Sequence, residues 1–420
     1  MDWSSRIGVA GLGLFAAGGF ANQGVFYAGL LLMLLALSLR GRDFWRRARS
    51  RPFVWVSLAL SGYITVNWLL AWRQGSAEWR PEILESGFDL LLAGGAFSLV
   101  VAYWLGAGPR RIRWVLGLGL AGLVLSLAVG FDWSRLEVVM GGRRELFGMG
   151  NGAALYAGAG LIGVLILLLT GRGRPLWLVP PALLLVVVLA IVVLWSQTRA
   201  VWFALAVILP ALLLAMVWHG WRRGRGGRTL LLLLAGAGML GTAIVYNADI
   251  VDKRLARVEG GFLAMLADDS AGLEGSGLRY RAPLWEQARE LIGKRPWFGW
   301  GAGTSRMLIS ELDIKQSLTH YHNLYLQLLV ELGAVGLVLF LLWVVTALKT
   351  FWPAGRRDER DFPLLLFLLA AMALFLLAGL FQIRHDDERG HFFLISFGAL
   401  AVSRALYAGI APATGRRPAQ

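Results

Sequence analysis

The sequence predicts an all-α, polytopic integral membrane protein with about twelve transmembrane helices and one large loop outside the membrane. Two observations predict this class. Of the 420 residues, 57% are hydrophobic and 16% are charged, whereas soluble domains contain roughly 45–50% apolar and about 25% charged residues. The mean hydropathy is +0.62, and the apolar residues form runs close to the roughly 20 residues that cross a bilayer. This composition excludes a soluble globular enzyme.

The charged residues and the absence of cysteine exclude further classes. Lys and Arg number 41 against 26 Asp and Glu, which gives a net charge of +15. In a soluble protein this excess would indicate nucleic acid, but here the basic residues lie in short clusters between apolar runs, as at a cytoplasmic membrane face. No nucleic-acid partner is therefore predicted. The lack of cysteine excludes disulfides, thiolate metal sites and cysteine nucleophiles.

The charged positions divide the chain into twelve candidate spans. The first is short and glycine-rich but has no A-x-A-like cleavage site after it, so we expect it to be retained in the membrane. The last contains Arg404 near its end. Nine spans fall within 1–247, a large loop covers 248–319, three spans fall within 320–410, and a tail covers 411–420. The spans are 7–21, 24–39, 53–72, 88–106, 113–131, 151–170, 175–195, 199–219, 229–247, 320–347, 362–382 and 391–410.

The distribution of Lys and Arg predicts the orientation, because basic residues are retained on the cytoplasmic side. One set of alternate connections, which includes the runs 40–51, 222–228 and 349–360, carries 22 basic residues, and the short connections of the other set carry eight. Both termini are therefore predicted to be cytoplasmic. The large loop 248–319, with ten basic and ten acidic residues, is placed on the outer side.

The large loop is predicted to contain one amphipathic helix. Pro283 can start a helix, and Leu284, Ala288, Leu291 and Ile292 fall on one face of 284–294. Gly293 to Pro296 would end it. The following Gly299-Trp-Gly-Ala-Gly303 resembles a dinucleotide fingerprint superficially, but no strand precedes it in a βαβ unit, so we interpret it as a glycine-rich turn.

Two arginine sites could hold a phosphate group. Arg199 follows the very short outer turn Ser196-Gln197-Thr198 and starts a predicted span, where helix N–H groups already favour an anion. Arg279 and Arg281 stand directly before the amphipathic helix. Two such sites on one membrane face suit a diphosphate. The alternatives are a snorkelling arginine at the interface for Arg199 and solvated surface charge for the pair.

The segment Thr319-His320-Tyr321-His322-Asn323 opens the tenth predicted span. A histidine at the outer mouth of a membrane helix can act as a general base toward a hydroxyl. The alternative is a structural histidine that bonds to a loop carbonyl. Because residues at i and i+2 point to different faces of a helix, His320 and His322 are predicted to be a poor metal pair.

The other acidic residues of interest are interpreted structurally. Glu331 is the lone acid of its predicted span, and an intramembrane carboxylate is a functional candidate. Since a continuous helix would place it about half a turn round and roughly 13 Å deeper than His322, we expect it to pair with another helix instead. The loop 385–391 and Asp268-Asp269 hold possible metal ligands, but without metal-site spacing, so no metal is predicted.

Three stretches together resemble the O-antigen ligase and polymerase superfamily of bacterial envelope glycosyltransferases. The resemblance is specific over about 195–340. The stretches are Ser196–Arg199, Arg281-Ala-Pro-Leu-Trp285 through Arg295-Pro-Trp-Phe-Gly-Trp-Gly-Ala-Gly303, and His322-Asn-Leu-Tyr-Leu326 through Glu331-Leu-Gly333.

The resemblance implies a GT-C-like inner-membrane protein with one large periplasmic loop. It implies a transferase that moves a glycan from undecaprenyl pyrophosphate to an acceptor without a nucleotide sugar, metal or cofactor. Arg199 and Arg281 would hold the pyrophosphate and His322 would serve catalysis; Arg279, His320 and Asn323 are secondary candidates. The chemistry is self-consistent, because two arginines can neutralise the leaving pyrophosphate and His322 can deprotonate the acceptor hydroxyl. A single in-line displacement predicts inversion.

Three activities of this superfamily remain open: ligation of O-antigen onto lipid A-core, polymerisation of O-units, and oligosaccharide transfer onto protein. A single large loop late in the chain and a short predicted tail favour the ligase, because a polymerase is expected to have two sizeable periplasmic loops. The predicted partners are thus undecaprenyl-pyrophosphate-linked O-antigen, lipid A-core and membrane lipid. A lipid-linked glycan flippase is the alternative from another class, but its site would lie near the membrane midplane.

Overall fold

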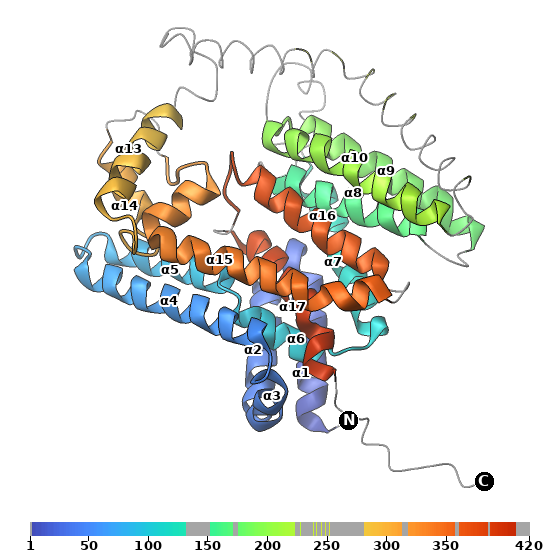
Figure 1. The fold of residues 1–420 in the computed structure, drawn as a ribbon, viewed down its shortest axis with the longest axis horizontal. Coiled ribbons are helices and arrows are strands. Elements are labelled where there is room, and N and C mark those ends of the chain that lie inside the picture. Colours follow the sequence, from blue (N-terminus) through green and yellow to red (C-terminus); the bar gives the residue numbers. More distant parts are fainter. Residues whose placement is uncertain are drawn as a thin grey trace.

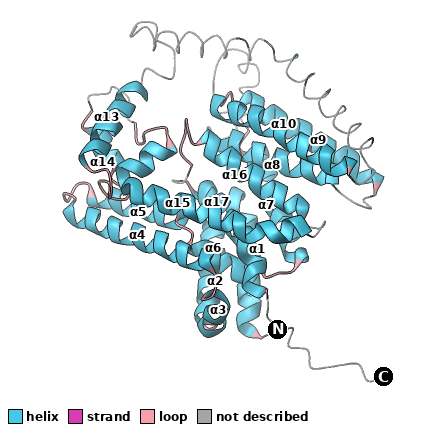
Figure 2. Ribbon diagram, viewed as in Figure 1, coloured by secondary structure: helices cyan, strands magenta, loops and turns pink. Residues whose placement is uncertain are grey.

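The computed structural model describes residues 2–131, 152–170, 175–222, 281–312, 318–357, 361–384 and 387–408, with isolated residues 227, 238, 241, 245, 248 and 252. Within these residues the chain is helical with connecting loops and contains no strand (Figure 2), which confirms the all-α class. Among the described residues, six helices are long and apolar enough to cross a membrane, or up to eight if each of two bent pairs is one span. The chain is an integral membrane protein, and the count of twelve spans stays a prediction.

The helices follow the apolar runs of the sequence closely, and Figure 1 labels them along the chain. Apart from the isolated residues given above, the predicted span 229–247 and the large loop before residue 281 lie outside the described residues, as does the tail 411–420. The helices are α1 (Trp3–Ala21), α2 (Gln23–Ser38), α3 (Gly41–Ala48), α4 (Pro52–Gln74), α5 (Arg80–Ala93), α6 (Ala96–Leu105), α7 (Pro109–Val129), α8 (Gly152–Thr170), α9 (Val179–Trp195) after a short 3₁₀ turn (Leu176–Leu178), α10 (Arg199–Trp221), α13 (Arg281–Lys294), α14 (Ser305–Ser310), α15 (Leu324–Arg357), α16 (Phe362–Ala378) and α17 (Glu388–Tyr407).

The chain bends sharply at two places, just after one predicted span and within another. The apolar run at 24–39 ends where α2 and α3 meet at 90°, and the run at 88–106 is divided between α5 and α6 at 44°. The second bend lies at Gly94-Gly95, where Gly95 has φ +98° and a Cβ would come within 2.4 Å of the Trp343 indole. Packing against Trp343 therefore decides a bend that the hydropathy of the run does not indicate.

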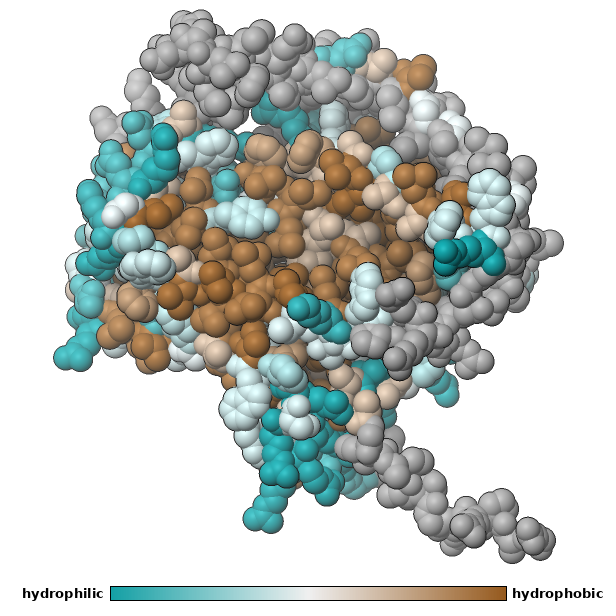
Figure 3. Space-filling model, in the orientation of Figure 1, coloured by the Kyte–Doolittle hydropathy of each residue, from teal (hydrophilic) through white to brown (hydrophobic). Residues whose placement is uncertain are grey.

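The surface is apolar where a bilayer would contact it. Figure 3 shows a broad hydrophobic band across the centre of the molecule, with hydrophilic side chains gathered toward its edges. The long apolar helices expose large apolar side chains, such as Leu31, Val66, Leu125, Leu184 and Leu214. An aqueous protein would not leave so much apolar surface uncovered, so lipid is the solvent of this band.

Contacts between connections of the described chain lie at two ends of the helices. At one end Arg51 donates to the Ala408 carbonyl at 2.6 Å, and Arg404 forms an ion pair with the buried Asp361. At the other end Arg306 pairs with Glu82 at 2.6 Å. The ion pair between Arg404 and Asp361 also explains how α17 accommodates an arginine within a predicted span. Which end faces the cytoplasm stays a prediction.

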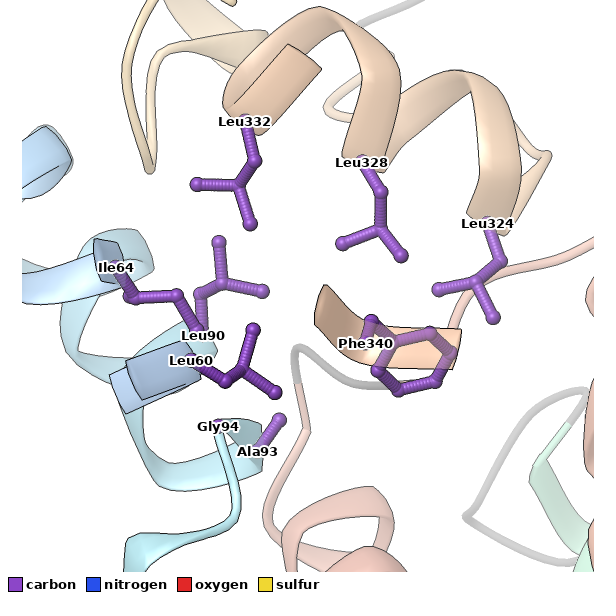
Figure 4. A pocket seen from close by; sticks show the side chains of 9 residues that line it. All are labelled: Leu60, Ile64, Leu90, Ala93, Gly94, Leu324, Leu328, Leu332 and Phe340. Carbon is purple, nitrogen blue, oxygen red and sulfur yellow. The ribbon is translucent and has the colours of Figure 1, made fainter. Parts of the chain in front are cut away.

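The observed helix α15 differs from the helix predicted over 320–347. It begins at Leu324, not at His320, and it is broken at Gly333 (φ +66°, ψ −171°). In a straight helix Leu324 and Phe340 would be about 24 Å apart, yet both line one apolar cavity together with Leu328, Leu332, Leu60, Ile64, Leu90, Ala93 and Gly94 (Figure 4). The segment 324–332 therefore folds back over the rest of α15.

Candidate functional site

The first candidate residue, Arg199, starts α10 at the end of the bundle where α16 finishes. Helices α10 and α16 are antiparallel, because His219 stacks on Phe362 at one end (centroids 3.7 Å apart) and Phe203 contacts Phe381 at the other (6.2 Å). The half-buried Arg199 lies one helical turn from Phe203. Arg199 is thus close to the segment that leads from α16 to α17.

The segment between α16 and α17 is also hydrogen-bonded to the loop that contains His322. The carbonyl of Gly379, just after α16, accepts a hydrogen bond from the Leu324 amide at 2.7 Å. Asn323 caps α15, because its Oδ1 accepts from the amides of Tyr325 at 2.9 Å and Leu326 at 3.1 Å. Asn323, a secondary candidate, therefore fixes the start of α15 directly after His322.

The helix that begins with Arg281 is joined to the other side of this loop. The Trp285 indole donates to the Tyr321 carbonyl at 2.9 Å, and the Tyr321 hydroxyl donates to Gln287 Oε1 at 3.3 Å. The predicted apolar face of α13 is confirmed, since Leu284, Ala288 and Leu291 are buried in a small core that includes Tyr321 and Val330. The helix ends at Lys294, within the predicted stop, but it begins at Arg281, two residues before the predicted start at Pro283. The contacts thus bring the elements of Arg199, Arg281 and His322 to one end of the molecule. Arg279 lies outside the described residues.

Backbone strain marks two of these segments. Among the described residues, Gln197 and His322 are the only non-glycine residues with positive φ, both at +52°. An L-residue adopts this left-handed conformation at a cost of about 1–2 kcal/mol. Strain of this kind persists where the surrounding structure imposes it, and it is concentrated at functional sites. Both outliers fall in the two turns that the sequence identified.

The two histidines contact each other, contrary to the expectation that they would diverge. His320 Nε2 and His322 Nδ1 are 3.1 Å apart, and His320 Nδ1 is 3.0 Å from Thr319 Oγ1. The prediction assumed that both belonged to a helix, but both precede Leu324, so the i, i+2 rule for helices does not apply. The imidazoles form a short relay that orients the His322 ring.

Glu331 belongs to a buried polar network, and its predicted pairing with another helix stays a prediction. Its carboxylate accepts from Gln327 Nε2 at 2.7 Å and from the Gly303 amide at 3.2 Å. Gln327 Oε1 in turn accepts from the Tyr321 amide at 3.2 Å. The network therefore connects the residue before His322 with the glycine-rich turn. Burial, reinforced by the charges of Glu331 and Glu311, raises the pKa of Tyr321, so its phenol stays a neutral donor.

The glycine-rich turn is structural, as interpreted from the sequence. Gly299, Gly301 and Gly303 all have positive φ, and a Cβ on Gly299 would lie 2.5 Å from the Glu331 backbone. The amides of Trp300 and Gly301 donate to the carbonyls of Val330 and Glu331 at 2.8 and 2.9 Å. The turn completes the hydrogen bonds of the broken helix.

Several residues that hold this site together were not predicted. Asn67 of α4 donates to the Phe298 carbonyl at 2.8 Å and accepts from the Ala302 amide at 2.7 Å, and Tyr63 donates to the Leu332 carbonyl at 2.6 Å. Asn67 is a lone asparagine in an apolar run, and this pattern could have indicated its role in the sequence. Gln327, four residues before Glu331, was a usable signal for the network.

We expect Glu331→Leu to destabilise the protein by about 2–3 kcal/mol, because it leaves the buried Gly303 amide and the Gln327 carboxamide without their acceptor. Glu331→Gln keeps an acceptor oxygen and should cost less. Thermal unfolding of the purified protein in detergent measures both. Equal melting temperatures for wild type and Glu331→Leu would contradict the role of the network.

The acidic loop near α17 also has a structural role where it is described. Asp387 caps α17 through the Gly390 amide at 2.6 Å, and it accepts from the Tyr156 hydroxyl at 2.9 Å and from Arg384 at 3.1 Å. The described residues contain no group of three or more His, Asp or Glu side chains placed to hold a metal ion. His385, Asp386, Asp268 and Asp269 lie outside them.

A family model described as O-antigen ligase matches residues 184–341. The match runs from α9 into α15, so it contains Arg199, Arg281 and His322 together with the polar network around Glu331. No curated protein matches the chain.

Proposed function

The chain belongs to the O-antigen ligase and polymerase superfamily, and on this premise we propose that it is an O-antigen ligase. Members of the matched family are membrane glycosyltransferase-like enzymes. The proposed reaction transfers O-antigen from undecaprenyl pyrophosphate to a hydroxyl of lipid A-core. The proposed location is the bacterial inner membrane, with the site on the periplasmic face. The observation that carries the proposal is the series of contacts that joins α10, α13 and the His322 loop at one end of the helices.

In the proposed reaction Arg199 and Arg281 bind the donor pyrophosphate. Each starts a helix, so backbone N–H groups and the helix dipole add to the guanidinium charge. A lipid pyrophosphate is a good leaving group, and the protein needs only to stabilise the negative charge that develops on it as the glycosidic bond breaks. Two bidentate guanidinium groups can do this.

His322 is the proposed general base. In the tautomer in which its Nε2 carries the lone pair, Nδ1–H donates to His320 Nε2, and Nδ1–H of His320 donates to Thr319 Oγ1. The acceptor hydroxyl loses its proton to Nε2 while its oxygen attacks the anomeric carbon. The pyrophosphate leaves from the opposite face, so the transferred glycan has inverted configuration. His320 acts as a positioning residue that holds the tautomer.

The ligase is favoured over the polymerase by the loops of the sequence. The large predicted loop covers 248–319, whereas the next in size, 132–150, is much shorter. A polymerase or a protein oligosaccharyltransferase would use the same donor chemistry with another acceptor. A flippase would also need cations, but it has no need of a base.

The direct test offers purified protein undecaprenyl-pyrophosphate-linked O-glycan and lipid A-core in the presence of EDTA. A glycan–lipid A-core product supports a ligase that needs no metal ion. A lengthened donor glycan would indicate a polymerase instead. Movement of the donor across vesicles without any product would indicate a flippase.

We expect Arg199→Lys and Arg281→Lys each to lower kcat/KM for the donor by about 10- to 100-fold. Lysine keeps the charge but loses the bidentate fork, and hydrogen bonds to charged groups contribute about 1.5–3 kcal/mol. Steady-state transfer at varied donor concentration measures the effect. Arg306→Lys is the matched control, because Arg306 lies at the same end but forms an exposed pair with Glu82, and it should change kcat/KM by less than about fivefold. Equal losses in all three variants would contradict the assignment.

A further inference from the structure

Two adjacent aromatic residues are exposed in the turn that follows α13. Trp297 is 66% exposed and Phe298 is 65% exposed, although each has a large apolar side chain. Apolar residues scattered singly over a surface need no explanation, but a contiguous apolar patch marks an interaction site. No step of the proposed reaction uses these two residues, so their exposure requires a separate explanation.

The turn lies beside the middle of a candidate membrane span and not beyond its end. The Phe298 carbonyl accepts from Asn67 Nδ2 at 2.8 Å and from the Tyr63 hydroxyl at 3.4 Å. Both donors belong to the candidate span α4, seven and eleven residues before its last residue, Gln74, and this spacing corresponds to roughly 10–16 Å along the helix axis. Phe298, which the sequence assigned to the large outer loop, is thus level with the apolar part of α4.

The turn is also joined to α15, the neighbouring candidate span. The carbonyls of Pro296 and Trp297 accept from the amides of Ala334 and Val335 at 2.8 and 3.2 Å. Helices α4 and α15 pack side by side (Figure 1), and both expose large apolar side chains. These are Val66, Leu69 and Leu70 on α4 and Val338, Leu341 and Leu342 on α15. The two aromatic residues therefore adjoin two helices whose exposed faces suit lipid.

The backbone of the turn meets the requirement for irregular structure at membrane depth. Hydrocarbon contains no water to pair a free amide or carbonyl, so such segments occur only where the protein supplies the partners. Over 296–303 the protein pairs the amides of Gly299, Trp300, Gly301, Ala302 and Gly303 and the carbonyls of Pro296, Trp297 and Phe298. A turn in water could leave many of these groups to the solvent.

The charges next to the turn match a layer of lipid headgroups. Lys294 and Arg295 lie directly before it and are exposed, and the Arg295 guanidinium is 4.2 Å from the centre of the Trp300 ring. Long basic side chains bury their stems in apolar surroundings while the charge reaches the headgroups. Aromatic residues beside Lys and Arg are typical of segments at the boundary between headgroups and acyl chains. This composition favours lipid over a protein partner.

We propose that the turn 296–303 is re-entrant: it enters the lipid layer at the Gln74 end of α4, and Trp297 and Phe298 contact the acyl chains of phospholipids. The contact anchors the end of α13 in the membrane. Because the Trp285 indole of α13 donates to the Tyr321 carbonyl, the anchor also fixes the height of the His322 loop relative to the bilayer. The inference rests on the contacts of the turn and does not depend on the proposed ligase activity.

The test uses the absence of cysteine from the chain, which lets a single introduced cysteine report one position. Trp297→Cys and Phe298→Cys are made in the full chain, labelled with a nitroxide and placed in phospholipid nanodiscs. Collision of the nitroxide with oxygen, which concentrates in the bilayer, is compared with collision with a water-soluble nickel chelate. We expect both labels to lie at least about 5 Å below the lipid phosphates.

Two further cysteines calibrate the measurement. Val66→Cys is the lipid control, because Val66 is exposed on α4 beside Asn67. Glu286→Cys is the control in water, because Glu286 is exposed on α13. The labels at 297 and 298 should resemble the label at 66 and differ from the label at 286. Since both aromatic residues are exposed, each labelled variant should keep the wild-type melting temperature, and if one melts earlier, the other position decides.

Two results would overturn the proposal. A label that meets the nickel chelate as readily as the label at Glu286 would place the turn in water. A label shielded from both oxygen and the chelate would show that a second copy or another protein covers the aromatic residues. Glycan transfer is assayed separately, and a protein that transfers no glycan would contradict the proposed ligase while leaving the measured depth of the turn valid.

Discussion

Replacing His322 with Asn is expected to lower the rate of glycan transfer about 100-fold or more while leaving donor affinity nearly unchanged. The side chain supplies the only base in the proposed reaction, and general base catalysis contributes about 10²–10⁴-fold. Asn is chosen because it tolerates the left-handed backbone that His322 adopts at φ +52°. The loss therefore reports the imidazole and not backbone strain. Single-turnover transfer with donor in excess measures it.

A second variant tests the same assignment. His320→Ala removes the orienting contact at 3.1 Å but keeps the His322 imidazole, so the loss of activity should be smaller, about tenfold. Full activity of His322→Asn would exclude the base role, and unchanged donor movement across vesicles in that variant would favour a flippase.

Gly333→Ala is expected to destabilise the protein by about 3 kcal/mol or more and to abolish transfer. Gly333 has φ +66° and ψ −171°, a conformation that is essentially restricted to glycine. A Cβ would also lie 2.3 Å from the Trp297 carbonyl oxygen, and this atom is fixed by its bond to the Val335 amide. Relieving the clash would separate the glycine-rich turn from α15 and release the Glu331 network. Thermal unfolding and the transfer assay measure the two effects.

Gly117→Ala is the matched control for this prediction. Gly117 lies within α7, and a Cβ there meets no atom within 4 Å. Alanine is the better helix former by about 0.5–1 kcal/mol, so this variant should be as stable as wild type or more stable. Similar melting temperatures for Gly333→Ala and Gly117→Ala would show that the break in α15 is not required by the fold.

The sequence by itself determined the features that depend on neighbouring residues. The membrane class follows from the length of the apolar runs, and the face of α13 follows from the spacing of Leu284, Ala288 and Leu291. The start of α10 at Arg199 follows from the turn residues before it, and the end of α13 follows from the stretch Gly293 to Pro296. Hydropathy and helical period are local properties, so an amino-acid sequence shows them directly.

Only the tertiary structure decided how these segments meet. The break at Gly333 brings Leu324 and Phe340 to one cavity. The predicted distance between Glu331 and His322 assumed one continuous helix, which the structure does not contain. The relay between His320 and His322, the cap at Asn323 and the support from Asn67 depend on loops whose shape is imposed by α4, α13 and α16. Such contacts join residues distant in the chain, and packing fixes them against local preference. No local pattern in the sequence specifies them.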